Sequence, residues 1–227
     1  MLSVPPTCKS TAGLPEPLFD LLFEKATRRE LKSGELLFST GDAGDGCYRI
    51  HTGLLKVFVT SLFGDDRIVA ILGVGDVVGE LSMIDGLPRS ASVVAITNCE
   101  LQFISRDTFF EKASRDSEIQ AVLVRTLAMR LREAVKSMAA ASFLTVKGRV
   151  ARVLLDLARQ FGEESKGHIL LNHKINHGDI AALAGVAREN VSRALSEFRR
   201  RKILVHQRNR YDIANLAALQ REANYGG

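Results

Sequence analysis

Between Gly34 and about Ile104 the sequence consists of short runs of β-branched, aromatic and aliphatic residues separated by glycines. The runs are GELLF, YRI, LLKVFV, RIVAIL, ASVVAI and CELQFI. Short strands at this spacing, with turn residues between them, are typical of an antiparallel barrel or roll. Because no helical pattern alternates with the runs, a doubly wound α/β fold is not expected.

Helical patterns flank this segment. Residues 14–32 predict a short helix with prolines near its start, where proline is tolerated. Residues 107–142 contain neither glycine nor proline and predict one long helix. Its apolar residues recur at spacings of three and four, as in a heptad seam that pairs with a second copy of the helix. The predicted dimer interface consists of Val124, Leu127, Leu131, Ala134 and Met138. The alternative, a helix packed on its own domain, would carry a wider apolar stripe.

Charge is distributed unevenly along the chain. Residues 1–144 carry 16 Lys and Arg against 18 Asp and Glu, whereas residues 145–227 carry 15 against 8, a net charge of +7. A basic C-terminal block indicates a polyanion partner; the alternative is a basic domain with no such partner.

Composition limits the compartment and the chemistry. No run of 18 apolar residues predicts a membrane span, and the first residues do not resemble a secretory signal, so a cytoplasmic protein is expected. The three cysteines, Cys8, Cys47 and Cys99, are widely spaced with no CxxC pair. Neither a disulfide framework nor a metal site is therefore expected.

Residues 176–201 carry the most specific local pattern. Asn176 followed by Asp179 predicts a capped helix start, and HGDIAALA predicts the helix itself. Gly185 is a turn residue that can adopt positive φ. A second helix is predicted from about Arg188 to Arg200. Its inward-facing residues are expected to be Val191, Leu195 and Phe198.

The outward face of the second helix has side chains suited to reading base edges. Arginine donates two hydrogen bonds to guanine, glutamate accepts one from cytosine, and serine reaches a base edge or a phosphate. The basic run RRRK at 199–202 follows, and VHQRNRYDI predicts a hairpin wing near the phosphate backbone. An ordinary surface ion-pair pattern, the alternative, does not explain why these residues follow a glycine turn. The predicted DNA contacts are His177, Arg188, Glu189, Ser192, Arg193, Arg200 and Lys202.

These motifs resemble those of the CRP/FNR family of bacterial transcription regulators over nearly the whole chain. DIAALAGVARENVSRALSEF is similar to the family helix-turn-helix, FLTVKGRVARVLLDLA to its hinge, and FSTGDAGDGCYRIHTGLLKVF to its β-roll. Arg188, Glu189 and Arg193 match the base-reading positions, and Ser192 resembles the serine of the FNR branch. Glu189, Ser192 and Arg193 also fit the TTGAT-like half-site of the FNR branch. Because Arg188 matches an arginine that only the catabolite-activator branch carries, the resemblance implies a palindrome of TGTGA-like half-sites. It also implies RNA polymerase as a partner.

GELSMIDGLPRSAS, residues 79–92, resembles the phosphate-binding cassette of cyclic-nucleotide-binding domains. Glu80 can accept a hydrogen bond from a ribose 2′-OH, and Arg89 can pair bidentately with a cyclic phosphate. Backbone amides and Ser90 can complete an anion nest. The alternative is a Glu80–Arg89 ion pair with no ligand. The resemblance implies an effector site made by Gly79, Glu80, Leu81, Arg89, Ser90 and Ala91.

One departure from the family concerns the base of such a nucleotide. In cyclic-AMP-sensing members a Thr-Ser pair on the long helix reaches the adenine, and the matching positions here are Ala134 and Val135. Neither side chain forms hydrogen bonds. The effector stays open among cAMP held by other groups, cGMP, another small anion, or none. The family's oxygen-sensing cysteine cluster is absent, so the three cysteines are interpreted as packing or incidental thiols.

The sequence therefore predicts an α+β protein in three parts. They are an N-terminal antiparallel, jelly-roll-like β-roll (14–106), a long dimerisation helix (107–143) and a C-terminal winged helix-turn-helix domain (144–227). We expect a homodimer that reads double-stranded DNA under control of an effector, or, alternatively, the same regulator controlled without a nucleotide. An enzyme is not expected, because no Ser-His-Asp set, metal-ligand spacing or nucleophile elbow appears.

Overall fold

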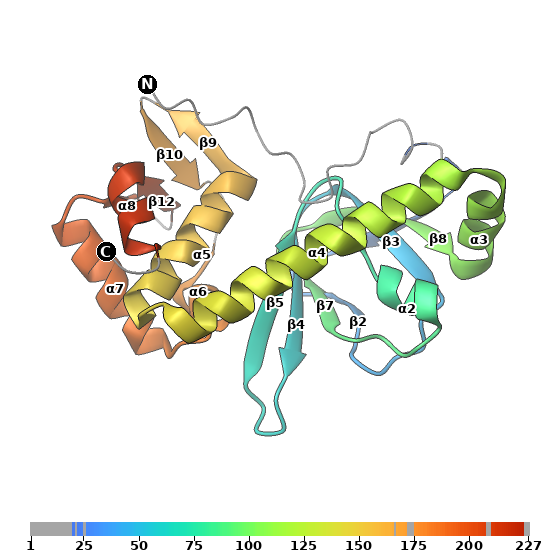
Figure 1. The fold of residues 1–227 in the computed structure, drawn as a ribbon, viewed down its shortest axis with the longest axis horizontal. Coiled ribbons are helices and arrows are strands. Elements are labelled where there is room, and N and C mark those ends of the chain that lie inside the picture. Colours follow the sequence, from blue (N-terminus) through green and yellow to red (C-terminus); the bar gives the residue numbers. More distant parts are fainter. Residues whose placement is uncertain are drawn as a thin grey trace. The chain divides into compact units, whose positions relative to one another are not determined.

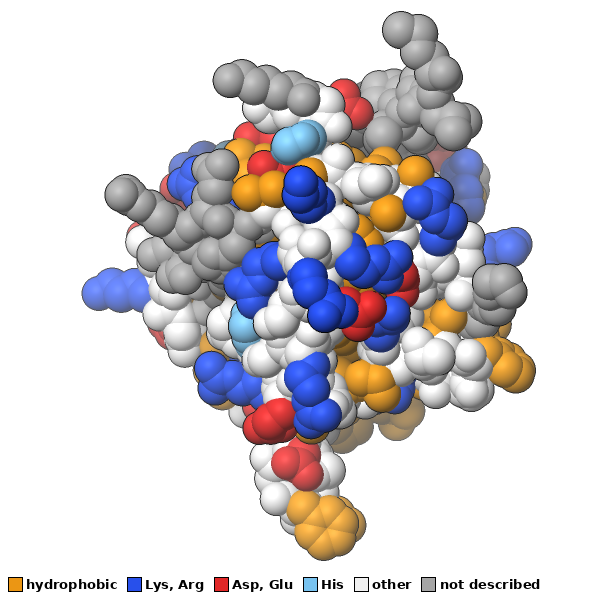
Figure 2. Space-filling view, turned by 90° about the vertical axis from the view of Figure 1, so that its left-hand side faces the viewer, with side chains coloured by type: hydrophobic (Ala, Val, Ile, Leu, Met, Phe, Trp, Pro, Cys, Tyr) orange, Lys and Arg blue, Asp and Glu red, His pale blue; other side chains and the backbone are white. Residues whose placement is uncertain are grey.

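The structure of the chain, a computed structural model, describes residues 20, 22–24, 26–165, 167–171, 175–207 and 210–224. These residues form two compact units, one ending at Arg132 and the other beginning at Glu133. Figure 1 labels most of the elements of each unit, and Figure 2 shows lysine and arginine side chains gathered over the C-terminal unit. Within the described ranges, no helix is long and apolar enough to cross a membrane, and no cluster of His, Cys, Asp and Glu is arranged to hold a metal ion.

Two four-stranded antiparallel sheets form the N-terminal unit, as the predicted β-roll requires. Their strand orders are β1-β8-β3-β6 and β2-β7-β4-β5. The strands are β1 (Thr27–Leu31), β2 (Leu36–Phe38), β3 (Gly46–Thr52), β4 (Leu55–Thr60), β5 (Asp66–Leu72), β6 (Val77–Val78), β7 (Ser92–Ala95) and β8 (Cys99–Ser105). The six apolar runs of the sequence correspond to β2, β3, β4, β5, β7 and β8.

The prediction of a helix over residues 14–32 is wrong at its C-terminal end. Residues 27–31 form β1, which pairs with β8 from Thr27 opposite Phe103 to Leu31 opposite Cys99. Only Leu31 of this strand is buried, so its polar sequence carries no alternation that would reveal a strand. Residues 14–19 lie outside the described residues.

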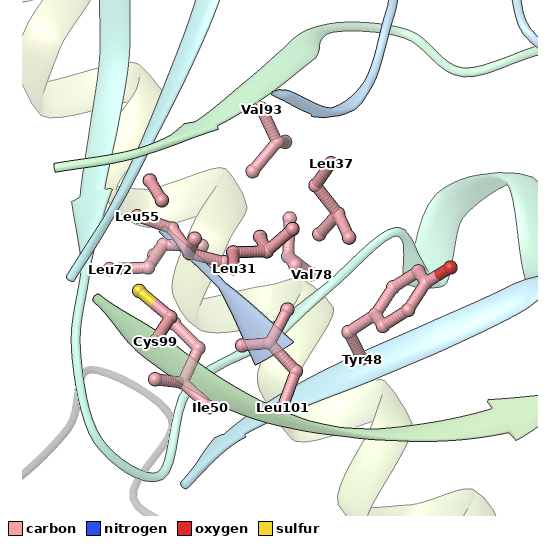
Figure 3. Packing of buried hydrophobic residues seen from close by; sticks show 11 residues of the cluster. Leu31, Leu37, Tyr48, Ile50, Leu55, Leu72, Val78, Val93, Cys99 and Leu101 are labelled. Atoms are coloured by element: carbon pink, nitrogen blue, oxygen red, sulfur yellow. The ribbon is translucent and has the colours of Figure 1, made fainter. Parts of the chain in front are cut away.

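Inward-facing side chains of both sheets meet in one apolar core (Figure 3). In β8, Cys99 and Leu101 are buried while Glu100 between them is exposed, the alternation of a strand with one face on the core. Each fully buried aliphatic side chain contributes about 1.5–3 kcal/mol. The core residues are Leu31, Leu37, Tyr48, Ile50, Leu55, Leu72, Val78, Val93, Ala95, Cys99 and Leu101.

Two of the cysteines serve as packing residues. Cys47 and Cys99 are buried free thiols in the two apolar clusters of the N-terminal unit. Burial raises the pKa of both thiols above the usual value, so both are protonated and unreactive near neutral pH. Cys8 lies outside the described residues.

A short helix, α2 (Glu80–Asp85), lies inside the cassette segment and was not predicted. Gly79 precedes it with φ 86° and Gly86 ends it with φ 73°, conformations that side-chain-bearing residues rarely adopt. Arg106 donates hydrogen bonds to the carbonyls of Ser82 at 3.2 Å and Ile84 at 3.4 Å. The C-terminal end of α2 is thereby tied to the helix that follows β8.

Two helices follow β8 where the sequence predicts one. α3 (Arg106–Arg115) and α4 (Ser117–Phe143) are separated at Asp116, whose backbone is extended. The Asp116 carboxylate accepts a hydrogen bond from the Glu118 amide at 2.8 Å and so caps the start of α4. The break needs neither glycine nor proline, because an aspartate can end one helix and cap the next. α4 contributes residues to both compact units.

Helices and a small sheet make up the C-terminal unit. Its elements are α5 (Val146–Phe161), β9 (Gly162–Ser165), β10 (His168–Leu171), α6 (His177–Ala184), α7 (Arg188–Arg200), β11 (Leu204–Gln207), β12 (Arg210–Ile213) and α8 (Leu216–Glu222). The sheet order is β11-β12-β10-β9. The wing hairpin and the helix-turn-helix lie where they were predicted, and the wing tip, residues 208 and 209, lies outside the described residues.

Two features of this unit were not predicted. α5 starts at Val146, and the Thr145 hydroxyl caps it by accepting a hydrogen bond from the Gly148 amide at 3.1 Å. α8 was not predicted; its start is capped by Asn215, whose side chain accepts from the Ala218 amide at 2.9 Å.

The helix-turn-helix follows its local signals. The Asn176 side chain accepts a hydrogen bond from the Asp179 amide at 3.0 Å, and the Asp179 carboxylate accepts one from the Asn176 amide at 3.2 Å, a reciprocal capping box. Gly185 ends α6 with φ 61°. On α7, the three residues predicted to face inward are fully buried: Val191, Leu195 and Phe198.

α7 ends in a Schellman motif with a lysine at the position that usually takes glycine. The Ile203 amide donates to the Phe198 carbonyl and the Lys202 amide to the Arg199 carbonyl, both at 2.9 Å. Lys202 adopts φ 55°, the one positive φ of a non-glycine residue within the described ranges. A left-handed backbone costs a residue with a side chain about 1–2 kcal/mol.

Replacing this lysine should therefore stabilise the fold. We expect Lys202→Gly to raise the free energy of unfolding by about 0.5–1 kcal/mol, because glycine adopts the left-handed conformation without strain. The matched variant Arg200→Gly, two residues earlier and still in helical backbone, should lower it by about 1 kcal/mol. Urea unfolding measures both; a Lys202→Gly protein less stable than the wild type would contradict this reading of the motif.

Candidate functional site

The predicted cassette forms a site around two buried charges of opposite sign. Glu80 begins α2 and is 2% exposed, and Arg89 follows in the loop before β7 and is 3% exposed. A buried charge is tolerated only when it is paired and hydrogen-bonded, so the partners of these two side chains define the site.

Arg89 is held by several groups at once. Its Nη1 donates to the carbonyls of Gly46 and Gly79, both at 2.8 Å, and its Nη2 donates to Asp45 Oδ1 at 2.9 Å. The guanidinium also lies 4.3 Å from the centroid of the Phe38 ring. A guanidinium has five N–H groups. Arg89 Nε is buried and has no hydrogen-bond partner among the described residues.

Glu80 pairs with a residue that the sequence analysis did not assign to the site. Arg130 of α4 donates to Glu80 Oε1 and to the Val77 carbonyl. The alternative of a direct Glu80–Arg89 ion pair is therefore wrong. Glu80 Oε2 is buried without a hydrogen-bond partner in the described part of the chain. The cassette thus keeps one buried acceptor and one buried donor unpaired.

The other predicted cassette residues surround these two. Gly79 allows the close approach of Arg89, since a Cβ there would lie 2.4 Å from Nη1. Leu81 and Ser90 are exposed, and Ala91 is half-buried. The segment therefore places exposed residues beside two buried charges.

The face of α4 that carries the predicted dimer interface is mostly exposed to solvent. Val124 is 65% exposed, Leu131 66% and Met138 71%, while Ala134 is exposed and Leu127 half-buried. Val135, at the second position where the family has a hydrogen-bonding pair, is 57% exposed. Large apolar side chains exposed in a row on one helix indicate a surface made for a partner.

The first turns of α7 expose the predicted base-reading side chains. Arg188, Glu189 and Arg193 are exposed on the face opposite the buried stripe. Ser192 is half-buried, and its hydroxyl donates to the Arg188 carbonyl at 3.2 Å. His177, at the start of α6, brings Nδ1 to 3.0 Å from the same hydroxyl, so the structure brings two predicted contacts together.

A shallow surface groove runs along α7 between these residues and the basic run that follows. Its lining is Ser192, Arg193, Ser196, Glu197 and Arg200. Arg200 and Lys202 are exposed, as expected of phosphate contacts. Arg201 differs from its neighbours in the run, because it forms ion pairs with Glu197 and Glu222.

Two family models match the chain. The model of the cyclic nucleotide-binding domain matches residues 28–116, and that of the Crp-like helix-turn-helix domain matches residues 148–222. The first range contains the cassette, and the second contains α6, α7 and the wing.

Relatives with assigned names agree with these matches. The chain is 37% identical over 183 residues to the cyclic AMP receptor protein of Thermus thermophilus, covering 81% of this chain and 82% of that protein. It is 36% identical over 168 residues to a CRP-like cAMP-activated global transcriptional regulator of Mycobacterium tuberculosis, covering 74% and 75%.

A solved structure supports the fold. FixK2 from Bradyrhizobium japonicum superposes with a TM-score of 0.80 at 23% identity, covering 89% of this chain and 99% of that one. With the β-roll, the cassette and the helix-turn-helix in place, the matches lead to one assignment: the chain belongs to the CRP/FNR family of transcription regulators.

Proposed function

We propose that the protein is a homodimer that binds a palindrome of TGTGA-like half-sites in cytoplasmic DNA and regulates transcription through RNA polymerase. The observation that carries the proposal is the exposed set Arg188, Glu189 and Arg193 on the first turns of a helix whose other face is buried. Arginine to guanine is the commonest specific contact in the major groove. DNA recognition, and not catalysis, is the activity proposed.

Dimerisation through α4 is supported by the exposed apolar seam. Two copies of the chain, paired along this seam, would carry two recognition helices to major grooves about 34 Å apart. Leu131 and Met138 are exposed to water in the single chain, so covering them with a second copy of the helix lowers the free energy.

A cyclic nucleotide, cAMP or cGMP, is the effector that the cassette fits. Glu80 Oε2 is an unpaired acceptor for a ribose hydroxyl, and Arg89 Nε is an unpaired donor for a phosphate oxygen. Effector binding is proposed to shift the population of DNA-binding arrangements. One observation favours the second candidate, a regulator without a nucleotide: Glu80 and Arg89 already have partners, Arg130 and Asp45.

Isothermal titration with cAMP and cGMP separates the two candidates. We expect wild-type protein to bind at least one of them, and Arg89→Lys to bind it about 30-fold more weakly, because lysine keeps the charge but not the fork of donors; this equals about 2 kcal/mol. Arg67→Lys, an exposed position on β5, is the control. Absence of wild-type binding to both nucleotides would leave the nucleotide-free candidate standing.

Charge placed in the seam should prevent dimerisation. Leu131→Glu would bury two carboxylates against each other in the paired helices, so the variant should sediment as a monomer and lose palindrome binding. Arg132→Glu, the adjacent exposed residue outside the seam, should remain a dimer. A dimeric Leu131→Glu protein with wild-type DNA affinity would exclude α4 as the interface.

Base reading and phosphate contact can be distinguished on a panel of half-site variants at several salt concentrations. Arg188→Ala should cost about 1–3 kcal/mol on the preferred site and relax preference at one base pair. Arg200→Ala should weaken all sequences equally and reduce the salt slope by about one unit. If Arg188→Ala weakened every sequence by one factor, Arg188 would be a phosphate contact and the TGTGA assignment would lose its basis.

A further inference from the structure

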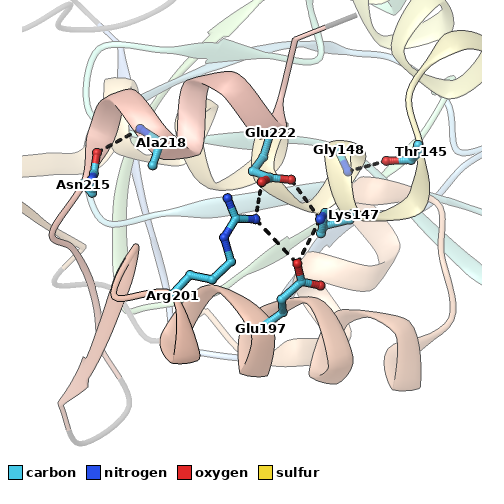
Figure 4. Close-up of polar contacts among 8 residues, drawn as sticks. All are labelled: Thr145, Lys147, Gly148, Glu197, Arg201, Asn215, Ala218 and Glu222. Atoms are coloured by element: carbon cyan, nitrogen blue, oxygen red, sulfur yellow. Dashed lines mark hydrogen bonds and ion pairs between the residues drawn. The ribbon is translucent and has the colours of Figure 1, made fainter. Parts of the chain in front are cut away.

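Four alternating charges join three helices of the C-terminal unit (Figure 4). Lys147 of α5 lies between two carboxylates, with Nζ 2.9 Å from Glu197 Oε1 and 3.1 Å from Glu222 Oε2. Arg201 closes the ring by pairing with the same two carboxylates, at 3.5 Å from Glu197 Oε1 and closely with Glu222. Glu197 lies on α7 and Arg201 is its C-terminal cap residue, whereas Glu222 is the last residue of α8. We call these four residues the charge ring.

The α8 side of the charge ring is firmly anchored. Leu219 is fully buried, and the amides of Ala214 and Asn215 both donate to the Ile203 carbonyl, at 3.0 and 3.2 Å. Gly148 lies so close to α8 that a Cβ would sit 3.0 Å from the Glu222 carbonyl oxygen. Glu222 itself has a side chain only 15% exposed. The position of the Glu222 carboxylate is therefore fixed by the packing of α8, and ion pairs to it can fix the position of α7.

Both carboxylates stay ionised near neutral pH. The hydrogen bond from Lys147 lowers the pKa of Glu197. Burial raises the pKa of Glu222, but hydrogen bonds from Arg201 and Lys147 outweigh burial and lower it. The ring is a network of charge-assisted hydrogen bonds. Such a network fixes the relative positions of its side chains better than an isolated surface ion pair does.

The α7 side of the charge ring adjoins the base-reading face. Arg193, Glu197 and Arg201 follow one another at intervals of four residues along one line of the helix, and Glu197 lines the same groove as Ser192 and Arg193. A small rotation of α7 would break the ring and would also move Arg193 relative to a base edge.

We propose that the charge ring positions the recognition helix, with Glu222 and Lys147 as positioning residues and Arg201 as a structural member and not a DNA contact. The proposal rests on the proposed function, because it assumes that α7 reads bases. In the run RRRK, it assigns phosphate contact to Arg200 and Lys202 and an internal role to Arg201.

Removing a negative charge distinguishes a residue that positions α7 from one that acts only through its charge, because the two roles change DNA affinity in opposite directions. Removing any negative charge from a DNA-binding domain strengthens its attraction to phosphates. Glu164→Gln, at an exposed site on β9, is therefore expected to bind all duplexes as well as the wild type or better. Glu222→Gln carries the same change in charge, but it should bind the preferred palindrome about 10-fold more weakly and keep its affinity for an unrelated duplex.

A second pair of variants tests Arg201. Arg201→Gln should lower the ratio of specific to non-specific affinity and leave the salt slope on the unrelated duplex unchanged. Arg200→Gln should reduce that slope by about one unit and leave the ratio unchanged. Lys147→Gln should lower the ratio of specific to non-specific affinity as Glu222→Gln does, and Lys147→Arg should restore most of it. The two Lys147 variants keep the test available if Glu222→Gln does not fold, since Lys147 is partly exposed.

The outcomes separate the two proposals. If Glu222→Gln and Lys147→Gln discriminate between duplexes as well as Glu164→Gln does, the positioning role is wrong although base reading stands. If Arg201→Gln reduces the salt slope as Arg200→Gln does, Arg201 is a phosphate contact. If the wild type itself shows no preference among duplexes, the proposed function fails first.

Discussion

The buried stripe of α7 is the constraint on which the rest of the C-terminal unit depends. Val191, Leu195 and Phe198 are essentially inaccessible to water, and any rotation of the helix would expose part of this surface. The opposite face, with Arg188 and Arg193, therefore points outward by necessity and not by chance. The capping box of α6, the left-handed Gly185 and the Schellman turn fix where the helices start and end, so the exposed charges have defined positions along α7.

In the N-terminal unit the corresponding constraint is the burial of Glu80 and Arg89. Each is held by a partner from a distant segment, Arg130 of α4 and Asp45 of the loop before β3. Each nevertheless keeps one polar atom unpaired. A site that is mostly satisfied without ligand, yet retains a matched acceptor and donor, can fold on its own and still gain from binding. Because Arg130 belongs to α4, the same ion pair connects the cassette to the helix proposed to form the dimer interface.

Elements whose structure is determined by residues close in sequence were predicted correctly. The approximate positions of both helices of the helix-turn-helix were predictable, because Asn176, Asp179 and Gly185 act through backbone groups within a few positions. The β-roll was predictable from its apolar runs. Strand β1 was not, since it is defined by pairing with β8, and the break at Asp116 was not, since an aspartate cap leaves no gap in helical composition.

The residues that sequence analysis failed to assign to the sites were missed for one reason. The residues Asp45, Arg130 and Glu222 act on partners that lie 44, 50 and at least 21 positions away in sequence. Sequence spacing carries no information about such contacts. Fold and motif could thus be predicted from one sequence, whereas the partners that hold the functional side chains had to come from the structure.

Recognition of a palindrome by a dimer of this chain can be tested by selecting binding sites from a pool of random DNA duplexes, with and without cAMP or cGMP. We expect enrichment of an inverted repeat with TGTGA-like half-sites whose centres lie about one helical turn apart. Recovery of unrelated sequences without a repeat, under all three conditions, would contradict this expectation.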